Sequence, residues 1–160
     1  MTLNEVPDEL QKLPNNDFIV VGLGNKMRGD DSSGVFIAEN GLKDFPDKFI
    51  NAETAIENHI FKITARPEKT IILVDAADFG GKPGDIKIIP LDNLKEMGIS
   101  THSLSLKRIN IFLSAGERRV FFLGMQPKNC DFESAMTEEV KKSAQNLLSF
   151  FREKLSKCTN

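Results

Sequence analysis

Apolar residues recur along this chain in two patterns, as short unbroken runs and as stripes spaced three or four residues apart. The runs predict strands, because a strand covered on both faces carries apolar side chains at almost every position. The stripes predict helices that bury one face. Runs and stripes alternate along the chain, so a helix is expected after most strands.

Five segments are expected to be strands. The clearest is Lys69–Ala76, which is apolar and rich in β-branched residues and is therefore expected to be buried on both faces. "GDIKIIPL" is bounded by Gly84 and Pro90, which is typical of a strand nearer an edge. The others are Asp17–Leu23, Phe49–Glu53 and "RRVFFLGMQP".

Four segments are expected to be helical. The last is the clearest, with Thr137 as its expected N-cap and acidic residues in its first turn. Its apolar stripe consists of Val140, Ala144, Leu147, Leu148, Phe151 and Leu155. The other three are Asp31 to Lys43 (stripe Val35, Ala38, Leu42), "IENHIFKITAR" (stripe Ile56, Ile60, Ile63), and about Ser103 to near Gly116.

Alternating strands and helices predict an α/β fold. We expect a three-layer sandwich, in which a mostly parallel twisted sheet of about five strands is covered by helices on both faces. A chain of 160 residues is long enough for one domain, so residues 1–160 are expected to form a single domain. In such sheets, ligands bind beyond the carboxyl ends of the strands.

The composition narrows the class of protein. Hydrophobic residues make up 40% and charged residues 28%, with a net charge of −2, so no basic field favours nucleic acid or an anionic membrane. No apolar run approaches the roughly 20 residues that span a bilayer, and the polar N-terminus does not resemble a signal peptide. Cys130 and Cys158 have no disulfide-framework spacing, which favours the reducing cytoplasm.

The turn after the first strand, "GLGNKMRGDD", is glycine-rich like a phosphate-binding turn but ends in two acids. A dinucleotide fingerprint requires glycine where Met27 stands, and a P-loop requires Lys and Ser or Thr where Asp30 and Asp31 stand. Two carboxylates would also repel a phosphate at a helix N-terminus. One aspartate is equally well explained as an N-cap, but a cap does not explain the second acid.

Two more polar residues follow apolar runs at expected strand ends. Asp75 closes the strongest strand; such an acid is often a turn residue, yet here it would be poorly solvated and would need a counter-charge, hydrogen bonds or a metal. His102 lies in "ISTHSLSL", just ahead of a helix, and a lone histidine is more often structural than a ligand. Asp31, Asp75 and His102 would together form an O,O,N set suited to nickel or zinc.

Four segments, "GLGNKMRGDDSSG", "ILVDAADFGGKPGDI", "STHSLSL" and "FFLGMQP", resemble in order and spacing the hydrogenase maturation endopeptidases. The subgroup most similar serves formate-hydrogenlyase-type nickel-iron hydrogenases. The resemblance runs from about Ile19 to the C-terminal helix. The chain departs from the family pattern at Ser32 and Ile56, and "QPKNCDFESAMTEEV" is a segment that varies among relatives and is a candidate for partner specificity.

This resemblance implies a cytoplasmic endopeptidase. Its partner would be the precursor of a [NiFe]-hydrogenase large subunit, from which it removes a C-terminal extension after nickel insertion. The family's metal-binding and catalytic set would fall on Asp31, Asp75 and His102, with nickel supplied by the substrate and zinc or cadmium as surrogates. We expect no nucleic-acid or membrane partner, and a monomer, because the helices show no extra apolar stripe.

Two other functions are considered. A nickel-binding escort would use the three ligands without cutting the precursor. A generic α/β nucleotide-binding module is disfavoured by the acidic turn. The sequence lacks the H-E-x-x-H of common zinc peptidases, and Cys130 is expected to be a buried or loop thiol rather than a nucleophile.

Overall fold

The computed structural model describes residues 6–93 and 100–157, with the backbone alone at residues 100–105 and 107. Its five-stranded sheet has the order β2-β1-β3-β5-β4. The strands are β1 (Phe18–Leu23), β2 (Phe49–Glu53), β3 (Thr70–Ala76), β4 (Ile86–Ile88) and β5 (Arg119–Met125). β4 runs antiparallel to β5, and all the other pairs are parallel. As predicted, β3 is buried throughout and the "GDIKIIPL" strand lies at an edge.

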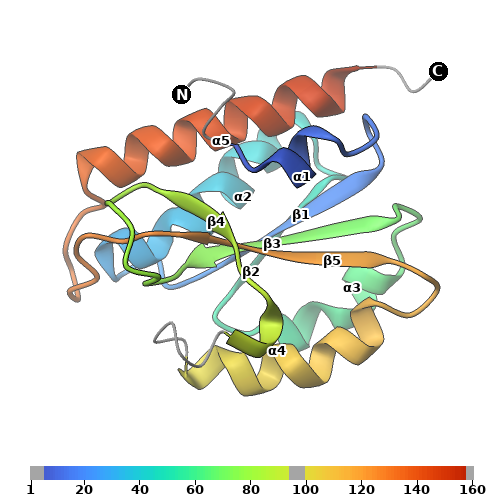
Figure 1. Cartoon of the computed structure of the whole chain (residues 1–160), viewed down its shortest axis with the longest axis horizontal. Coiled ribbons are helices and arrows are strands. Elements are labelled where there is room, and N and C mark those ends of the chain that lie inside the picture. The colour runs from blue at the N-terminus through green and yellow to red at the C-terminus, as the bar shows by residue number, and fades with distance from the viewer. Residues whose placement is uncertain (1–5, 94–99, 158–160) are drawn as a thin grey trace.

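Helices cover both faces of this sheet (Figure 1). The even-numbered side chains of β3 pack with α1 (Asp8–Gln11), α2 (Ser33–Asp44) and α5 (Glu138–Ser156). Its odd-numbered side chains pack with α3 (Ile60–Thr64) and α4 (Ser100–Leu113). The whole predicted stripe of α5 is buried. The predicted three-layer α/β fold with a mostly parallel sheet is therefore confirmed.

Several predicted boundaries were wrong by a few residues. The helix expected from Asp31 begins as a 3-10 turn, η2 (Gly29–Ser32), and becomes α2 only at Ser33. A second 3-10 turn, η3 (Ile56–His59), precedes α3. α4 begins and ends about three residues earlier than expected, because a Ser/Thr-rich stretch resembles a turn in sequence although it joins the helix here. α1 was not predicted.

Glycines allow α2 to lie directly against the ends of the central strands. A Cβ atom on Gly34 would lie 2.2 Å from the carbonyl oxygen of Val74 and 2.4 Å from that of Leu23. A Cβ atom on Gly22 would lie 2.1 Å from the carbonyl oxygen of Gly34. This close approach places η2, with Asp30 and Asp31, at the carboxyl ends of β1 and β3.

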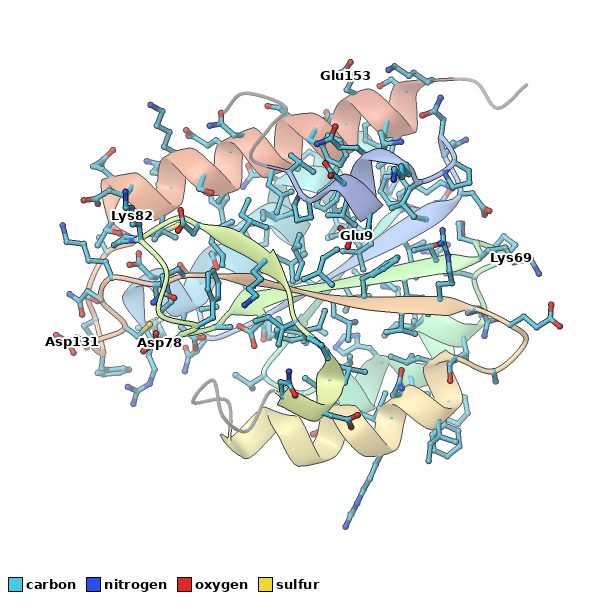
Figure 2. All side chains as sticks on the ribbon, viewed as in Figure 1. Glu9, Lys69, Asp78, Lys82, Asp131 and Glu153 are labelled. Carbon is cyan, nitrogen blue, oxygen red and sulfur yellow. The ribbon has the colours of Figure 1, made fainter. Side chains whose placement is uncertain are left out.

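The two ends of the sheet are distinct. Asp78 and Asp131, from the loops that follow β3 and β5, lie at one end, and Lys69, which precedes β3, lies at the other (Figure 2). Of the helices in the described part of the chain, none has the length and apolar character needed to cross a bilayer.

Candidate active site

Asp75 is a buried acid at the carboxyl end of the central strand. Only 1% of its surface is exposed, and the amide of Ala76 donates to Oδ1 at 2.8 Å. Burial raises the pKa of Asp75 well above its usual value, and the nearby charge of Asp31 raises it further. A hydrogen bond between the two carboxyl groups raises the pKa of Asp75 as well, and such a bond forms only when one of the two groups is protonated.

Asp31 reaches Asp75 from η2, and the glycine turn holds it there. The amide of Asn25 donates to Oδ2 of Asp31 at 3.1 Å. Gly24 has φ +136°, and a Cβ atom on it would lie 2.0 Å from the carbonyl oxygen of Asp31 and 3.4 Å from Oδ1 of Asp75. Glycine at position 24 is therefore required by the backbone conformation and by the closeness of both acids.

The turn cannot serve as a phosphate cradle, because its amides already donate within the protein. Their acceptors include the carbonyl oxygens of Glu53, Asn129 and Ser134 and the side chains of Asn25 and Asp31. The donors are Gly24, Asn25, Met27, Arg28, Gly29, Asp30 and Asp31. A phosphate-binding turn would instead leave such amides free to face the ligand.

Asp30 has a different partner set from Asp31. It is fully buried, and its carboxylate accepts hydrogen bonds from the amides of Lys128, Asn129 and Thr137 at 2.7–3.0 Å. The Thr137 hydroxyl lies 3.0 and 2.9 Å from its two oxygens. Thr137 thus stands at the N-cap of α5, as predicted, but its hydroxyl bonds to Asp30 and makes no cap. Asp30 braces the loop before α5 and caps no helix.

His102 lies in the first turn of α4. It was expected just ahead of the helix, and that placement was wrong. α4 packs on the face of the sheet to which Asp75 belongs, and its C-terminal end leads into the start of β5. Its first turn therefore lies toward the carboxyl ends of the strands, as do Asp31 and Asp75. The His102 side chain lies outside the described residues.

The predicted site is thus assembled in part. The side chains of Asp31 and Asp75 are brought together, while the third predicted ligand is placed by its backbone alone. Within the described side chains, no three His, Cys, Asp or Glu residues form a group able to hold a metal ion. Two adjoining acids, one buried and one half-buried, suit a divalent cation, because the cation's charge would take the place of a proton and relieve the repulsion between the carboxylates.

Cys130 is a neighbour of this pair that sequence reasoning did not place there. Burial, followed by the charges of Asp31 and Asp30, raises its thiol pKa to about 11. So high a pKa leaves little thiolate at neutral pH, as expected for a thiol that is not a nucleophile. The contact joins residues about 100 positions apart in sequence, so no local pattern indicates it.

The rim beside the pair carries two exposed apolar side chains, which were also missed. Met27 is 51% exposed and Phe132 is 59% exposed. The amide of Glu133 donates to the carbonyl oxygen of Met27 at 2.7 Å, and the guanidinium of Arg28 lies 5.7 Å from the centre of the Phe132 ring. We use the name apolar rim for Met27 and Phe132 together with Arg28, whose guanidinium lies over the Phe132 ring.

Comparison with known proteins identifies the family. Residues 39–152 match the family model HycI, described as hydrogenase maturation protease. The hydrogenase 3 maturation protease of Escherichia coli K12 is 32% identical over 132 residues, which cover 81% of this chain and 85% of that protein. These descriptions favour a protease over a non-proteolytic escort.

Solved structures agree with the sequence comparison. The [NiFe] hydrogenase maturation protease HycI of Thermococcus kodakarensis superposes with a TM-score of 0.75 at 28% identity, covering 89% of this chain and 94% of that one. The solution structure of the endopeptidase HycI of Escherichia coli gives a TM-score of 0.72 at 30% identity, with coverage of 85% and 89%. The chain belongs to the hydrogenase maturation protease family.

Proposed function

We propose that this protein removes the C-terminal extension of a [NiFe]-hydrogenase large-subunit precursor and recognises the nickel that the precursor carries. The observation that carries this proposal is the pair of buried Asp75 and half-buried Asp31 at the carboxyl edge of the sheet, where burial and the charge of Asp31 raise the pKa of Asp75. In a family of hydrogenase maturation proteases, such a pair is the expected place for a divalent cation and for proton transfer.

Asp31, Asp75 and His102 are the residues that would meet the nickel, as two oxygen ligands and one nitrogen ligand. Three protein ligands leave coordination positions open for the precursor's own ligands. For the same reason the free protein is expected to hold nickel weakly, with zinc or cadmium as surrogates. An empty precursor lacks the metal that these residues bind, and the protein would thereby discriminate loaded from empty precursor.

The acid pair would also serve the cleavage step. Hydrolysis of a peptide bond requires a base to take a proton from water and an acid to protonate the leaving amine. With nickel bound, both carboxyl groups of the pair are ionised, and we assign the role of base to one of them. The proton that this carboxylate takes from water is the one that it then donates to the leaving amine.

The apolar rim is the proposed contact surface for the body of the precursor. It belongs to the loops that carry Asp31 and Cys130, and Asp30 ties these loops together. We therefore propose that a macromolecule that brings a metal to Asp31 contacts this rim. The segment "QPKNCDFESAMTEEV", which contains Phe132, would then contribute to partner specificity.

Intact-protein mass spectrometry of the precursor tests this function. The nickel-loaded precursor should lose the mass of its C-terminal extension after mixing with this protein, and the empty precursor should keep its mass. A precursor that binds but keeps its full mass under both conditions would favour the escort instead. We further propose that the reaction takes place in the cytoplasm and that the protein acts as a monomer.

A further inference from the structure

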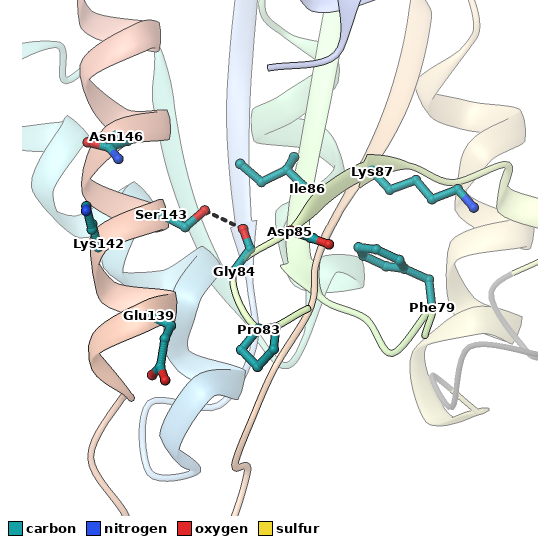
Figure 3. A pocket seen from close by; sticks show the side chains of 10 residues that line it. All are labelled: Phe79, Pro83, Gly84, Asp85, Ile86, Lys87, Glu139, Lys142, Ser143 and Asn146. Carbon is teal, nitrogen blue, oxygen red and sulfur yellow. Dashed lines mark hydrogen bonds between the residues drawn. The ribbon is translucent and has the colours of Figure 1, made fainter. Parts of the chain in front are cut away.

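A groove of about 620 Å³ follows the outer edge of β4 (Figure 3). One wall is the first half of α5, and the other is the loop between β3 and β4. The Ser143 hydroxyl donates to the carbonyl oxygen of Gly84 and joins the two walls (Figure 3). Two further hollows, of about 440 and 580 Å³, are lined by Ile86–Ile88 with Val6–Glu9 and by Ile88–Asp92. The outer edge of β4 is thus hollowed along its whole length.

The main-chain groups at this edge have a defined direction. The amide of Gln126 donates to the carbonyl oxygen of Asp85, and the amide of Ile89 donates to that of Phe122. Residues of an antiparallel strand point their main-chain groups alternately toward one side and the other. Asp85, Lys87 and Ile89 therefore face β5, while Ile86 and Ile88 present their N–H and C=O groups to the groove.

These outward groups are available to an incoming chain. Over the described residues, no hydrogen bond from another segment reaches the main chain of Ile86 or Ile88. An edge of this kind pairs with an extended peptide, which adds a strand through main-chain hydrogen bonds. With two outward residues, β4 offers contacts to a short segment.

The groove lies close to the acid pair. Asp75 pairs with Gly124, and Gly124 pairs with Lys87, so the three residues form one row across the sheet. Neighbouring strands are about 4.8 Å apart, so the main chain at Lys87 is roughly 10 Å from that at Asp75. The side chains of Ile89 and Ala77 lie over Gly124, so a peptide that joins the two places would cross above them. A peptide in extended conformation covers this span with about three residues.

The charge of the groove suits a chain that ends in a carboxylate. The lining contains Lys87, Lys142, Asp85 and Glu139. Glu139 is paired with Lys128 at 2.9 Å, and the Asp85 carboxylate accepts from the amide of Lys82. Among the described residues, neither Lys87 nor Lys142 has an acidic side chain within salt-bridge distance. By the same measure the Asp85 carboxylate has no basic partner among the described residues, so the unpaired charges of the groove are two positive and one negative, with a positive balance.

We propose that the groove along β4 binds the C-terminal extension of the precursor as an added edge strand, an inference that rests on the proposed function. The scissile bond lies at the acid pair, about three residues follow it across the sheet, and the rest of the extension pairs with Ile86 and Ile88. Its free carboxylate lies near Lys142 or Lys87. The extension is therefore recognised by its backbone and its terminal charge.

Amide hydrogen exchange gives the direct test, with a synthetic peptide of the precursor's C-terminal extension as the probe. The amides of Ile86 and Ile88 should exchange at least fivefold more slowly when the peptide is bound, and the amide of Lys87, already bonded to β5, should change little. Unchanged exchange at Ile86 and Ile88 with the peptide bound elsewhere would overturn the proposal. The proposal would also be overturned if, without peptide, the amides of Ile86 and Ile88 exchanged more slowly as the protein concentration rose. That result would show that a second copy of this chain pairs with the edge of β4.

Matched variants test the same proposal in cleavage of the nickel-loaded precursor. Ile86→Pro removes the outward N–H and should raise KM at least fivefold, whereas Ile86→Ala, which keeps the N–H and shortens the side chain, should raise KM by less than half as much. Lys142→Glu should raise KM, and Lys141→Glu, an equal charge change on a neighbouring exposed residue, should not. Equal effects within either pair would contradict the proposal. Complete absence of cleavage by the wild-type protein would refute the proposed function. The hydrogen-exchange experiment with the peptide would still show whether the groove along β4 binds the extension.

Discussion

The carboxyl groups of Asp31 and Asp75 adjoin at the carboxyl edge of the sheet, and both the charge of Asp31 and a hydrogen bond between the two groups raise the pKa of Asp75. The two residues come from different elements, η2 and β3, and Gly24 allows them to meet. Under the proposed function, the protonation of this pair would link stability to metal binding and to catalysis.

The raised pKa of Asp75 predicts how stability depends on pH. The pKa of Asp75 is raised in the folded state above its ordinary value of 3.8, so the folded state holds a proton that the unfolded state has released. Stability is therefore expected to fall as pH rises from about 4 through the folded pKa, with a slope of up to about 1.4 kcal/mol per pH unit. Asp75→Asn should flatten this dependence in urea unfolding between pH 4.5 and 7.5. An equal slope in both proteins would show that the pair holds no such proton.

Asp30 is predicted to act on stability rather than on metal binding. An amide at position 30 cannot accept all the hydrogen bonds that Lys128, Asn129 and Thr137 donate, so Asp30→Asn should lower the free energy of unfolding by about 3 kcal/mol. Thr137→Val removes the hydroxyl donor alone and should lower it by about 1–2 kcal/mol. Chemical denaturation gives both values. Substitutions at ordinary surface sites change the free energy of unfolding by up to about 0.5 kcal/mol. A change no larger than this for Asp30→Asn would contradict the bracing role of Asp30.

The Cys130 thiol is predicted to react slowly. With a pKa of about 11, roughly 0.1% of it is thiolate at pH 8, against about a quarter of an ordinary thiol, so alkylation should be roughly two hundredfold slower. Asp31→Asn removes a nearby negative charge, lowers the thiol pKa and should speed the reaction several-fold. Iodoacetamide labelling followed by mass spectrometry in a Cys158→Ser background measures both rates. Labelling at the rate of an unperturbed thiol would place Cys130 away from the acids.

The apolar rim is predicted to contribute to precursor binding. Phe132→Ala should raise KM for the precursor roughly tenfold with kcat unchanged, because truncating an anchoring aromatic side chain removes about 1.4 kcal/mol or more of binding energy. Phe112→Ala is the matched control, since Phe112 is exposed to the same degree, 60% against 59%, but lies near the far end of α4. Equal KM changes in the two variants would exclude a specific role for the rim.

The spacing of apolar residues along the chain was sufficient to predict most of the fold. The run of β-branched residues in β3 and the stripe of α5 each bury the predicted side chains, because these patterns match the periods of strand and helix. The start of α4 was placed three residues late, since serine and threonine compete for turn and cap geometries. The C-terminal end of α4, at Leu113 rather than near Gly116, and the short helix α1 were also not predicted.

The site was predictable only where residues follow strand ends. Asp31 and Asp75 could be paired because parallel neighbouring strands bring their carboxyl ends together. The partners of Asp30 and the position of Cys130 depend on a loop about 100 residues further along the chain, whose path no local pattern determines. Atoms of the chain itself lie where Cβ atoms of Gly24 and Gly29 would be, and at Gly29 these contacts come from residues distant in sequence that no local pattern identifies.

The central claim is that Asp31 meets the nickel-bearing precursor, and one measurement tests it most directly. Nickel-loaded precursor is mixed with wild-type protein, with Asp31→Asn or with Asp47→Asn, an equal change on an exposed loop aspartate that precedes β2, and its intact mass is followed over time. We expect wild type and Asp47→Asn to remove the C-terminal extension at similar rates and Asp31→Asn to leave the precursor at full mass while keeping its fold by circular dichroism. Removal of the extension by Asp31→Asn at the wild-type rate would contradict the account.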